Sequence, residues 1–501
     1  MILMKNLINW NFDNTYSKLP DTFKENIVPV SVKDPEILMV NEDLARELDL
    51  DFSKTEKNQL SALFAGNVLP EGSNSIAQAY AGHQFGTFVP QLGDGRATLL
   101  GEIVDVNGNR KDFQLKGSGR TPFSRNGDGK ATLGPVLREY LISEYMHAIN
   151  IPTTRSLAVI TTGEMVLREE ALPGAVLVRI ASSHVRIGTF QYFSARQMTD
   201  EIKLLADYII ARHYPLVLSQ KEPYLRLFQN VLDRQANLIS DWMSIGFIHG
   251  VMNTDNTTLS GETIDYGPCA FMDQFHYDKV FSSIDHTSRY CYQNQPRIIL
   301  WNLTRLAEAM LSLIDENVEI SIRKIEEVLN EFPKAYENLW LGKMSRKLGL
   351  KKIKHADKTL VEGFLDLLHK ENLDFNTSFH FLEKLLEGRH GFKGRITKDH
   401  QNTLNKIEAS SWYNKWKERL LTEEVDQKKI IERLSKNNPS AFPRNHLVQK
   451  VLSSAIYDGD LNPFNNLLKE LMSPFMKRTF NNTMAQAPTP SEEVTQTFCG
   501  T

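Results

Sequence analysis

The spacing of hydrophobic residues divides the chain into a strand-rich first part and a mostly helical second part. Between residue 85 and about residue 181, short alternating or β-branched runs are separated by glycines, as in KDFQLKG, SLAVITTGEMVLREE and AVLVRIA. This pattern is typical of strands joined by tight turns, and a hairpin turn is expected at residues 161–164. One helix is predicted within this part, in GPVLREYLISEYMHAIN, where apolar residues recur at helical spacing and Pro135 suits a first turn.

After about residue 198 the apolar residues follow helical spacing almost throughout, for example in EIKLLADYIIARHY and RIILWNLTRLAEAMLSLI. This pattern continues to about residue 472. The last segment, residues 476–501, is polar, contains prolines and has few apolar residues, so we expect a mobile tail. The pattern predicts an α+β protein, with a sheet-rich lobe that carries one main helix followed by a helical lobe. Protein kinases have this layout, and so do many other α+β enzymes.

Composition adds limits to this picture. A chain of 501 residues is too long for a single core. With 41% hydrophobic and 24% charged residues it has the composition of a soluble globular protein, and a net charge of −3 gives no electrostatic reason to bind nucleic acid or an anionic membrane. We find no signal peptide and no run of roughly 18 apolar residues. Its 3 cysteines are too few for a disulfide framework, so we expect a cytoplasmic protein.

The stretch HGVMNTDN can be compared with the kinase catalytic loop H-R-D-L-x-x-x-N by counting. Asn256 lies at the kinase spacing from His249, but Val251 stands where the kinase base aspartate would be. An aspartate, Asp255, comes directly before Asn256, and an Asp-Tyr-Gly triplet follows from Asp265. Carboxylate and amide oxygens suit Mg²⁺, so Asn256 and Asp265 are candidate metal ligands. The alternative is that both stretches are turns rich in turn-forming residues.

A glycine-rich stretch, QLGDGRATLL, lies between two predicted strands of the first part. Backbone amides at Gly93 and Gly95 could approach a phosphate with Arg96 beside them, although a glycine turn in a hairpin is the simpler explanation when the stretch is taken alone. The heptapeptide GDGRATL recurs almost unchanged as GDGKATL from residue 127, where it leads into the predicted helix. A helix N-terminus preceded by glycine attracts anions, because its first amides are unpaired and the helix dipole is positive there.

A lysine, one of two glutamates and two arginines before about residue 198 could complete a phosphate site. Lys116 ends the predicted strand KDFQLKG, in the place of the phosphate-pairing strand lysine of kinases. Either Glu139 or Glu144 in the predicted helix could orient it. Arg179 and Arg186 flank a Ser-Ser-His turn and could converge on a phosphate. The alternative reading makes the lysine and the arginines ordinary solvated surface residues.

Together these motifs resemble the selenoprotein O family, pseudokinases that act as protein adenylyltransferases. QAYAGHQFG, QLGDGRA, QLKGSGRTPFSR, LREYL, HGVMNTDN and DYGPCAFMD occur in the order of that family, and the likeness covers roughly residues 75–300. The resemblance implies a protein-kinase-like two-lobed fold with additional C-terminal helices, in which ATP lies in the reverse orientation. AMP would then pass to Ser, Thr or Tyr hydroxyls of target proteins with release of pyrophosphate. Mg²⁺ or Mn²⁺ would assist, and UTP could replace ATP, so that UMP is transferred.

The resemblance also assigns roles to individual residues. It implies that Asp255 is the proton acceptor, that Asn256 and Asp265 hold the metal and that Glu139 positions Lys116. It implies that the nucleotide is held by Gly93, Gly95, Arg96, Lys116, Asp128, Gly129, Arg179, Arg186 and Asp265. The expected segments are 1–74 as an N-terminal extension, 75–190 as the nucleotide-binding lobe, 191–340 as the helical lobe with the catalytic and metal-binding loops, 341–475 as a C-terminal helical region, and 476–501 as the tail.

Two further functions stay open at this stage, a conventional ATP-dependent phosphotransferase and a non-catalytic ATP-binding scaffold. The missing base at Val251 disfavours the first, and the retained metal ligands Asn256 and Asp265 disfavour the second. The family often has cysteine or selenocysteine near the C-terminus, and Cys499 occupies that place. A disulfide between Cys269 and Cys499 would tether the tail near the active site; the alternative is a buried Cys269 and an inert Cys499.

Overall fold

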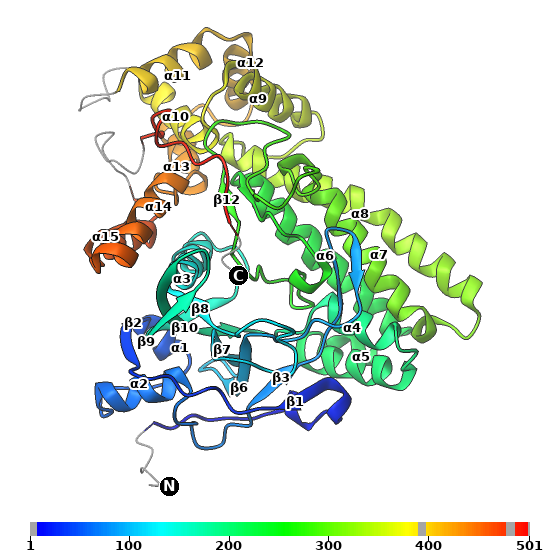
Figure 1. The fold of residues 1–501 in the computed structure, drawn as a ribbon. Helices are drawn as coiled ribbons and strands as arrows, with labels where there is room; N and C mark the ends of the chain where they lie inside the picture. The colour runs from blue at the N-terminus through cyan, green and yellow to red at the C-terminus, as the bar shows by residue number, and fades with distance from the viewer. Residues whose placement is uncertain (1–7, 389–396, 477–485, 499–501) are drawn as a thin grey trace.

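The structure is a computed structural model that describes residues 8–388, 397–476 and 486–498. Most of the strands come from the first part of the chain, and the second part is mostly helical. In Figure 1 the sheet-rich part, with the short helices α1 and α2, lies at the bottom, helix α3 lies above the sheet, and the helices of the second part lie at the top and on both sides. The predicted α+β class, with a sheet-rich first part and a helical second part, is therefore confirmed.

The central sheet has eight strands, and its neighbouring strands are antiparallel. Their order is β1-β3-β6-β7-β10-β9-β2, and β8 pairs with β10. Two strands come from the stretch that the sequence predicts as an N-terminal extension, so this stretch is part of the sheet. The strands are β1 (Lys24–Asn26), β2 (Glu36–Val40), β3 (Ile76–Gln78), β6 (Ala97–Val104), β7 (Arg110–Lys116), β8 (Ala131–Thr132), β9 (Arg155–Leu167) and β10 (Ala171–Ala181).

The alternation of side chains along strand β7 places apolar residues on one face of the sheet and polar residues on the other. On β7, Phe113 and Leu115 are buried in a core that also contains residues of the short helices α1 (Glu42–Glu47) and α2 (Lys57–Ala65). Successive side chains point to opposite faces of a sheet, so Gln114 and Lys116 lie on the other face. Arg179 of β10 pairs with Gln114 in the ladder and shares that face. Helix α3 (Leu133–Ala148) packs against β9 and β10.

The predicted hairpin turn at residues 161–164 is wrong. Strand β9 continues through this stretch, and the chain reverses at residues 168–170 instead. Thr161 pairs with Ala175 on one side and with Glu36 on the other, so backbone pairing holds it within the sheet. Gly163 has a φ of 68°, and a Cβ there would lie 2.5 Å from Cβ of Asp34. The glycine therefore reflects a close approach of the chain near residue 34.

The helices of the second part form two groups. Helices α6, α7 and α8 pack on one another beside the sheet, and they are preceded by two helices that follow β10. This first group is α4 (Ile187–Ser194), α5 (Thr199–His213), α6 (Pro223–Ser244), α7 (Gln295–Ile314) and α8 (Val318–Lys347). The second group, at the top of Figure 1 and along its left side, is α9 (Asp357–Glu371), α10 (Phe375–Glu387), α11 (Lys398–Ala409), α12 (Ser411–Leu421), α13 (Gln427–Asn437), α14 (Asn445–Ser453) and α15 (Asn462–Leu471).

Two small hairpins lie outside the central sheet. Strands β4 (Gly82–Gln84) and β5 (Thr87–Val89) pair with each other and extend from the sheet towards the helices. Strand β11 (Phe247–Ile248) pairs with β12 (Ala270–Phe271), and the HGVMNTDN segment lies in the chain between them.

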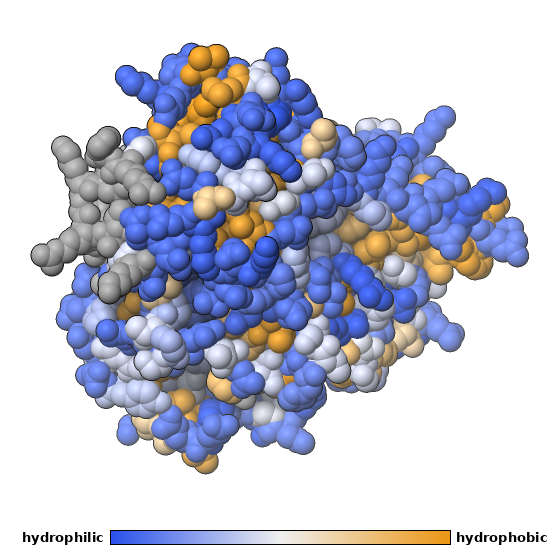
Figure 2. All heavy atoms as spheres, turned by 90° about the horizontal axis from the view of Figure 1, so that it is seen from above, coloured by the Kyte–Doolittle hydropathy of each residue, from blue (hydrophilic) through white to orange (hydrophobic). Residues whose placement is uncertain are grey.

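Within the described residues, no helix combines the length and the apolar character that crossing a membrane requires. The face in Figure 2 is mostly hydrophilic, with apolar patches interrupted by polar residues.

Candidate active site

A cleft of about 780 Å³ collects residues from the sheet and from the loops that flank β11 and β12. All but one of the residues to which the sequence assigns a site role line this cleft. They are Gly93, Gly95, Arg96, Lys116, Asp128, Gly129, Arg179, Arg186, Asp255, Asn256 and Asp265. The exception, Glu139, is buried in α3 directly behind Lys116. Motifs spread over more than a hundred residues thus meet in one place.

Two cations and two carboxylates form a closed network on the polar face of the sheet. The Nζ of Lys116 donates to Oε2 of Glu139 at 2.6 Å and to Oδ1 of Asp265 at 2.5 Å. Nη1 of Arg179 donates to the other oxygen of Glu139 at 3.1 Å and to the same Oδ1 of Asp265 at 2.7 Å. Gln114 accepts from Nε and Nη2 of Arg179 at 3.1 and 2.7 Å. These contacts hold both cations at the floor of the cleft.

The two glutamates of α3 that could have paired with Lys116 have different partners. Glu139 binds Lys116, as described above. Glu144 instead accepts from the guanidinium of Arg155 at 2.8 to 3.1 Å and from the backbone N–H of Ser156 at 3.0 Å. The structure therefore places Glu139 in the cleft network and Glu144 in a separate ion pair.

Asp265 is the point where the positive charges meet. Burial by itself would raise the pKa of Asp265, but the charges of Lys116, Arg179 and Arg186 outweigh burial and hold it well below its usual range. Nη2 of Arg186 lies 3.9 Å from Oδ2 of Asp265. Asp265 also has a φ of 62°, an uncommon backbone conformation for a residue with a side chain. The carboxylate is thus ionised and directed at the cations.

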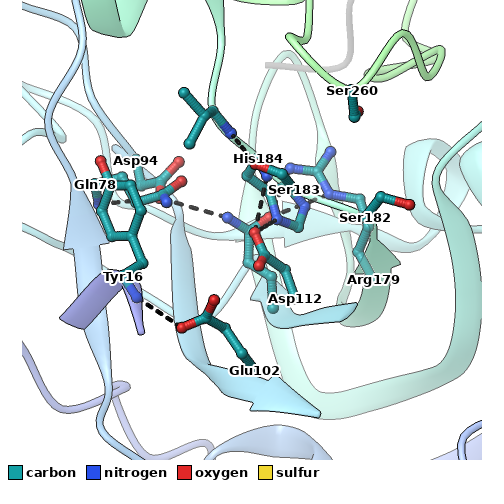
Figure 3. A network of polar contacts seen from close by, with 12 residues as sticks. Tyr16, Gln78, Asp94, Glu102, Asp112, Arg179, Ser182, Ser183, His184 and Ser260 are labelled. Carbon is teal, nitrogen blue, oxygen red and sulfur yellow. Dashed lines mark hydrogen bonds and ion pairs between the residues drawn. The ribbon is translucent and has the colours of Figure 1, made fainter. Parts of the chain in front are cut away.

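Arg186 is held from two further sides. Its Nη1 lies 3.5 Å from Oδ1 of the buried Asp94, and its guanidinium carbon lies 4.3 Å from the ring centroid of Tyr80. A guanidinium stacked on an aromatic face and paired with a carboxylate loses little entropy when it binds a further anion. Asp94, labelled in Figure 3 beside Gln78, accepts a hydrogen bond from the Gln78 backbone N–H at 3.1 Å.

Asn256 and Asp265 have the chemistry of ligands for a hard cation. The Nδ2 of Asn256 donates to the carbonyl oxygen of Val251 at 3.0 Å, which leaves its amide oxygen for another contact. Oδ2 of Asp265 lies away from Lys116, whose contact is with Oδ1. Among the described residues, no group of three or more His, Cys, Asp or Glu side chains could hold a metal. Because Mg²⁺ usually keeps water and takes phosphate oxygens as well as one or two protein oxygens, this pair fits it.

Asp255 lies in a short 3-10 turn, Thr254–Asn256, and is buried. Its Oδ2 accepts from Nε2 of Gln84 at 3.4 Å, whereas its buried Oδ1 has no hydrogen-bond partner among the described residues. Burial raises the pKa of Asp255 to about 6. A carboxyl group that lines a cleft and has a raised pKa is suited to accept a proton.

The β4–β5 hairpin fixes the turn that carries Asp255. The backbone N–H of His83 donates to Oγ1 of Thr254 at 2.7 Å, and that of Phe85 donates to Oδ1 of Asn253 at 3.0 Å. At Gly82 the two segments are so close that a Cβ would lie 2.6 Å from Oδ1 of Asp255. The hairpin therefore forms one wall of the site around the carboxylate.

Several residues of the site were missed by sequence reasoning. Gln114 could have been found, because it precedes Lys116 by two in an alternating strand and must share its face. Asp94 and Tyr80 lie within the quoted motifs, but local patterns do not show what they contact. Nη1 of Arg168 lies 2.8 Å from Oδ2 of Asp128, which is distant in the sequence, so no local pattern predicts this ion pair.

A second buried network lies behind Arg179, in the region of Figure 3. Asp112 of β7 accepts from the backbone N–H of His184 at 2.8 Å and contacts its Nδ1 at 2.9 Å. Arg212 of α5 binds Asp112 at 2.5 Å and also binds Glu102 of β6. The side chains of all four are almost completely buried. This network, the Arg212 clamp, joins α5 to the sheet beneath the cleft.

Of the two cysteines predicted to form the tail disulfide, the structure describes only Cys269. Cys269 is a free, buried thiol whose Sγ donates to the carbonyl of Tyr266 at 3.3 Å, and burial raises its pKa to about 11. Cys499 lies outside the described residues, so the disulfide stays a prediction. The tail that the sequence predicts as mobile is packed at Thr497, whose Oγ1 donates to the carbonyl of Pro268 at 2.5 Å and whose backbone pairs with Ser282.

Comparison with known proteins agrees with the motifs. A family model described as protein adenylyltransferase SelO matches residues 6–472. The chain is similar to proteins named protein nucleotidyltransferase YdiU from several bacteria. Identity is 48% to that of Rhodopseudomonas palustris (strain BisB18), over 99% of this chain and 100% of the relative. It is 49% to that of Pelagibacter ubique (strain HTCC1062), with the same coverage, and 46% to that of Geobacillus kaustophilus (strain HTA426), over 98% and 99%. The protein therefore belongs to the SelO family of protein adenylyltransferases.

Proposed function

We propose that the cleft transfers AMP from ATP to Ser, Thr or Tyr hydroxyls of target proteins and releases pyrophosphate. The observation that carries this proposal is the convergence of Lys116, Arg179 and Arg186 on Asp265, beside a buried carboxylate, Asp255, with one unpartnered oxygen. The family to which the chain belongs has the same type of reaction in its description.

We further infer that the fold is kinase-like and two-lobed. Two features support this inference: a strand lysine paired with a buried helix glutamate, and an aspartate that lies between β11 and β12, after the HGVMNTDN loop. The departure is at Val251, which lines the cleft where a kinase would carry its base. Asp255 is the carboxylate near that point, so the base position has moved within the loop.

A reversed nucleotide explains the number of cations at the floor of the cleft. If the β- and γ-phosphates enter first, their negative charge lies among Lys116, Arg179 and Arg186, which already share one carboxylate. Buried phosphates need such compensation, and guanidinium groups bind phosphate oxygens in pairs. The α-phosphate is then left nearer the mouth, on the side of Asp255. Gly93, Gly95, Arg96, Asp128 and Gly129, which line the same cleft, are the proposed remaining contacts.

Asn256 and Asp265 are the proposed holders of Mg²⁺ or Mn²⁺. When bound, the cation would neutralise charge on the phosphate oxygens. The rest of the work falls to this chain's own side chains. Glu139 holds the ammonium of Lys116 in place, and Gln114 does the same for Arg179, so both cations are preorganised for the charge that develops during transfer.

The chemical step is a displacement at the α-phosphorus. The hydroxyl oxygen of the target forms a bond to the α-phosphorus, and the bond from that phosphorus to the oxygen bridging to the β-phosphate breaks. Pyrophosphate takes the electron pair of the broken bond, and the hydroxyl proton passes to the carboxylate of Asp255. The pKa of this carboxyl, which burial raises to about 6, suits that role.

Product analysis tests the reaction class. The protein is incubated with ATP, Mg²⁺ or Mn²⁺ and a cell extract that supplies target proteins, and the released phosphates are separated by chromatography. We expect pyrophosphate in proportion to the modified protein. Release of ADP instead would identify a conventional phosphotransferase, and binding of ATP with no product would identify a scaffold.

The pairing of Lys116 with Glu139 predicts different effects for the two glutamates of α3. We expect Glu139→Gln to lower the transfer rate about 100-fold, because Lys116 and Arg179 both lose a charged partner that positions them. Glu144→Gln is the matched control; it weakens the ion pair with Arg155 and should lower thermal stability with a much smaller effect on the rate. Equal rates for the two variants would contradict the assignment.

The close approach of Gly82 to Asp255 predicts a selective defect in the chemical step. In Gly82→Ala the added methyl would lie 2.6 Å from Oδ1 of Asp255, so the carboxylate must move. We expect kcat for transfer to fall about tenfold or more, with little change in the KM for ATP, because displacement of a reacting group by a fraction of an ångström is costly. Gly342→Ala in α8, where the nearest atom is 3.7 Å away, should leave both constants unchanged. A normal kcat in Gly82→Ala would show that Asp255 does not take part in the step.

A further inference from the structure

A cationic, aromatic surface lies next to the proton-accepting side of the cleft. Arg289 lies in the loop after β12, and its guanidinium carbon lies 4.7 Å from the ring centroid of Trp301 and 5.7 Å from that of Tyr290. Arg305 lies over the same tryptophan at 5.0 Å. The rings of His83 and Trp301 are perpendicular to each other, with their centroids 5.1 Å apart. These five residues, here named the Arg289 surface, are half-buried except for the buried Tyr290.

The charge of Arg289 is not neutralised within the part of the chain that the structure describes. Arg305 has an ion pair with Glu308 at 2.8 Å, whereas Arg289 forms none with any carboxylate of the described residues. Within the same described part, the buried Nε of Arg289 also has no hydrogen-bond partner. Side chains held by aromatic packing, as Arg289 is, retain their position without a counter-ion. Half-buried Arg, Trp and Tyr together are typical of strong binding positions in protein interfaces.

The β4–β5 hairpin sets the spacing between this surface and Asp255. Gln84 contacts Oδ2 of Asp255, and two residues later a Cβ at Gly86 would lie 3.5 Å from the guanidinium carbon of Arg289. Two residues of extended chain span at most about 7 Å. Phe85 lies between the two points, lines the cleft and packs on Tyr290 with ring centroids 5.0 Å apart. The hairpin therefore offers a short path along which a peptide whose hydroxyl reaches Asp255 can extend to the Arg289 surface.

Resting on the function proposed above, we propose that the Arg289 surface is a specificity subsite that binds an acidic side chain, Asp or Glu, of the target protein two or three residues from the acceptor hydroxyl. The guanidinium offers paired N–H donors that match a carboxylate. The aromatic rings around it exclude water and so strengthen the ion pair. Because Arg289 would contact the target protein and not the nucleotide, it affects the choice of target and not the affinity for ATP.

The test compares two synthetic peptides with one acceptor threonine. The first carries glutamate two residues before and two residues after the threonine, and the second carries glutamine at both places. For the unaltered protein we expect kcat/KM to be about tenfold or more higher for the glutamate peptide, as a charge-assisted hydrogen bond allows. In Arg289→Gln we expect the preference to vanish because kcat/KM falls for the glutamate peptide and not for the glutamine peptide. The KM for ATP should be unchanged.

Two further variants make the result specific. Arg226→Gln, on α6 and distant in sequence, should keep the preference. Arg289→Glu should favour a third peptide, with lysine at the two flanking places. Equal transfer to the first two peptides, transfer to neither, or a preference retained in Arg289→Gln would overturn the proposal. Labelling of a cell extract from α-labelled ATP, measured in parallel, shows whether the proposed reaction still stands in those cases.

Discussion

Replacement of Asp265 by asparagine or alanine is expected to abolish transfer, with a loss of about 1000-fold or more. Asp265 accepts from both Lys116 and Arg179 and lies near Arg186, and it is one of two proposed metal ligands. Either change removes the charge on which these cations converge. The amide of Asp265→Asn keeps the shape of the side chain, so a loss in this variant reports on charge. The rate of label transfer from ATP measures the effect.

The control for this prediction is Asp207→Asn. Asp207 lies on α5 and pairs with Lys203, with both side chains largely exposed, so its loss should leave the rate unchanged. Thermal unfolding of each variant shows whether it is folded. A folded Asp265→Asn with more than about a tenth of the normal rate would refute the role of Asp265 in the reaction.

Replacement of Arg212 by methionine is expected to lower the free energy of unfolding by about 3–5 kcal/mol. Arg212 donates to Asp112 and Glu102 and, through Nε, to the carbonyl of Ser182 at 3.0 Å. Methionine fills similar space but leaves two buried carboxylates without their cation. The cost is the penalty of these unpaired charges and not the value of a surface ion pair. Urea unfolding followed by circular dichroism measures it.

The sign of the pH dependence gives this prediction a second readout. Burial by itself would raise the pKa of Asp112, but Arg212 and His184 outweigh it and hold that pKa well below its usual range. The stability that a depressed carboxylate contributes is present above its unfolded pKa of about 3.9 and lost as the pH falls. The free energies of unfolding of the unaltered protein and of Arg212→Met should therefore become more similar below about pH 4. Arg46→Met, at an exposed pair with Asp43, should change stability by less than about 1 kcal/mol at any pH.

The residues of the site could be predicted where local spacing decides their position. Strand alternation places Lys116 at the end of β7, and the predicted helix contains two glutamates, Glu139 and Glu144, that could pair with it. The structure was needed only to show that Glu139 is the partner. The interval between His249 and Asn256 and the placement of Asp265 are also local features. Such patterns depend on neighbours in the chain, which sequence reasoning can count.

Other features depend on contacts between distant segments and could not be predicted. Nothing near Gln84 indicates that it reaches Asp255, and nothing near Arg212 indicates buried partners on β6 and β7. The turn expected at residues 161–164 failed for the same reason, because pairing with β2 and β10 overrides the local preference of a Thr-Thr-Gly sequence. The β-strands of the first 74 residues likewise join the sheet through partners far along the chain.

The central claim is that the α-phosphate of ATP, and not the γ-phosphate, reaches the acceptor beside Asp255. The most direct measurement incubates the protein, Mg²⁺ or Mn²⁺ and a heat-inactivated cell extract, whose own kinases no longer act, with ATP labelled at the α-phosphorus or, separately, at the γ-phosphorus. It then follows label into protein. Asp255→Asn serves as the inactive control in both reactions. We predict incorporation from the α-label only, and its loss in the variant. Incorporation from the γ-label only would contradict the account.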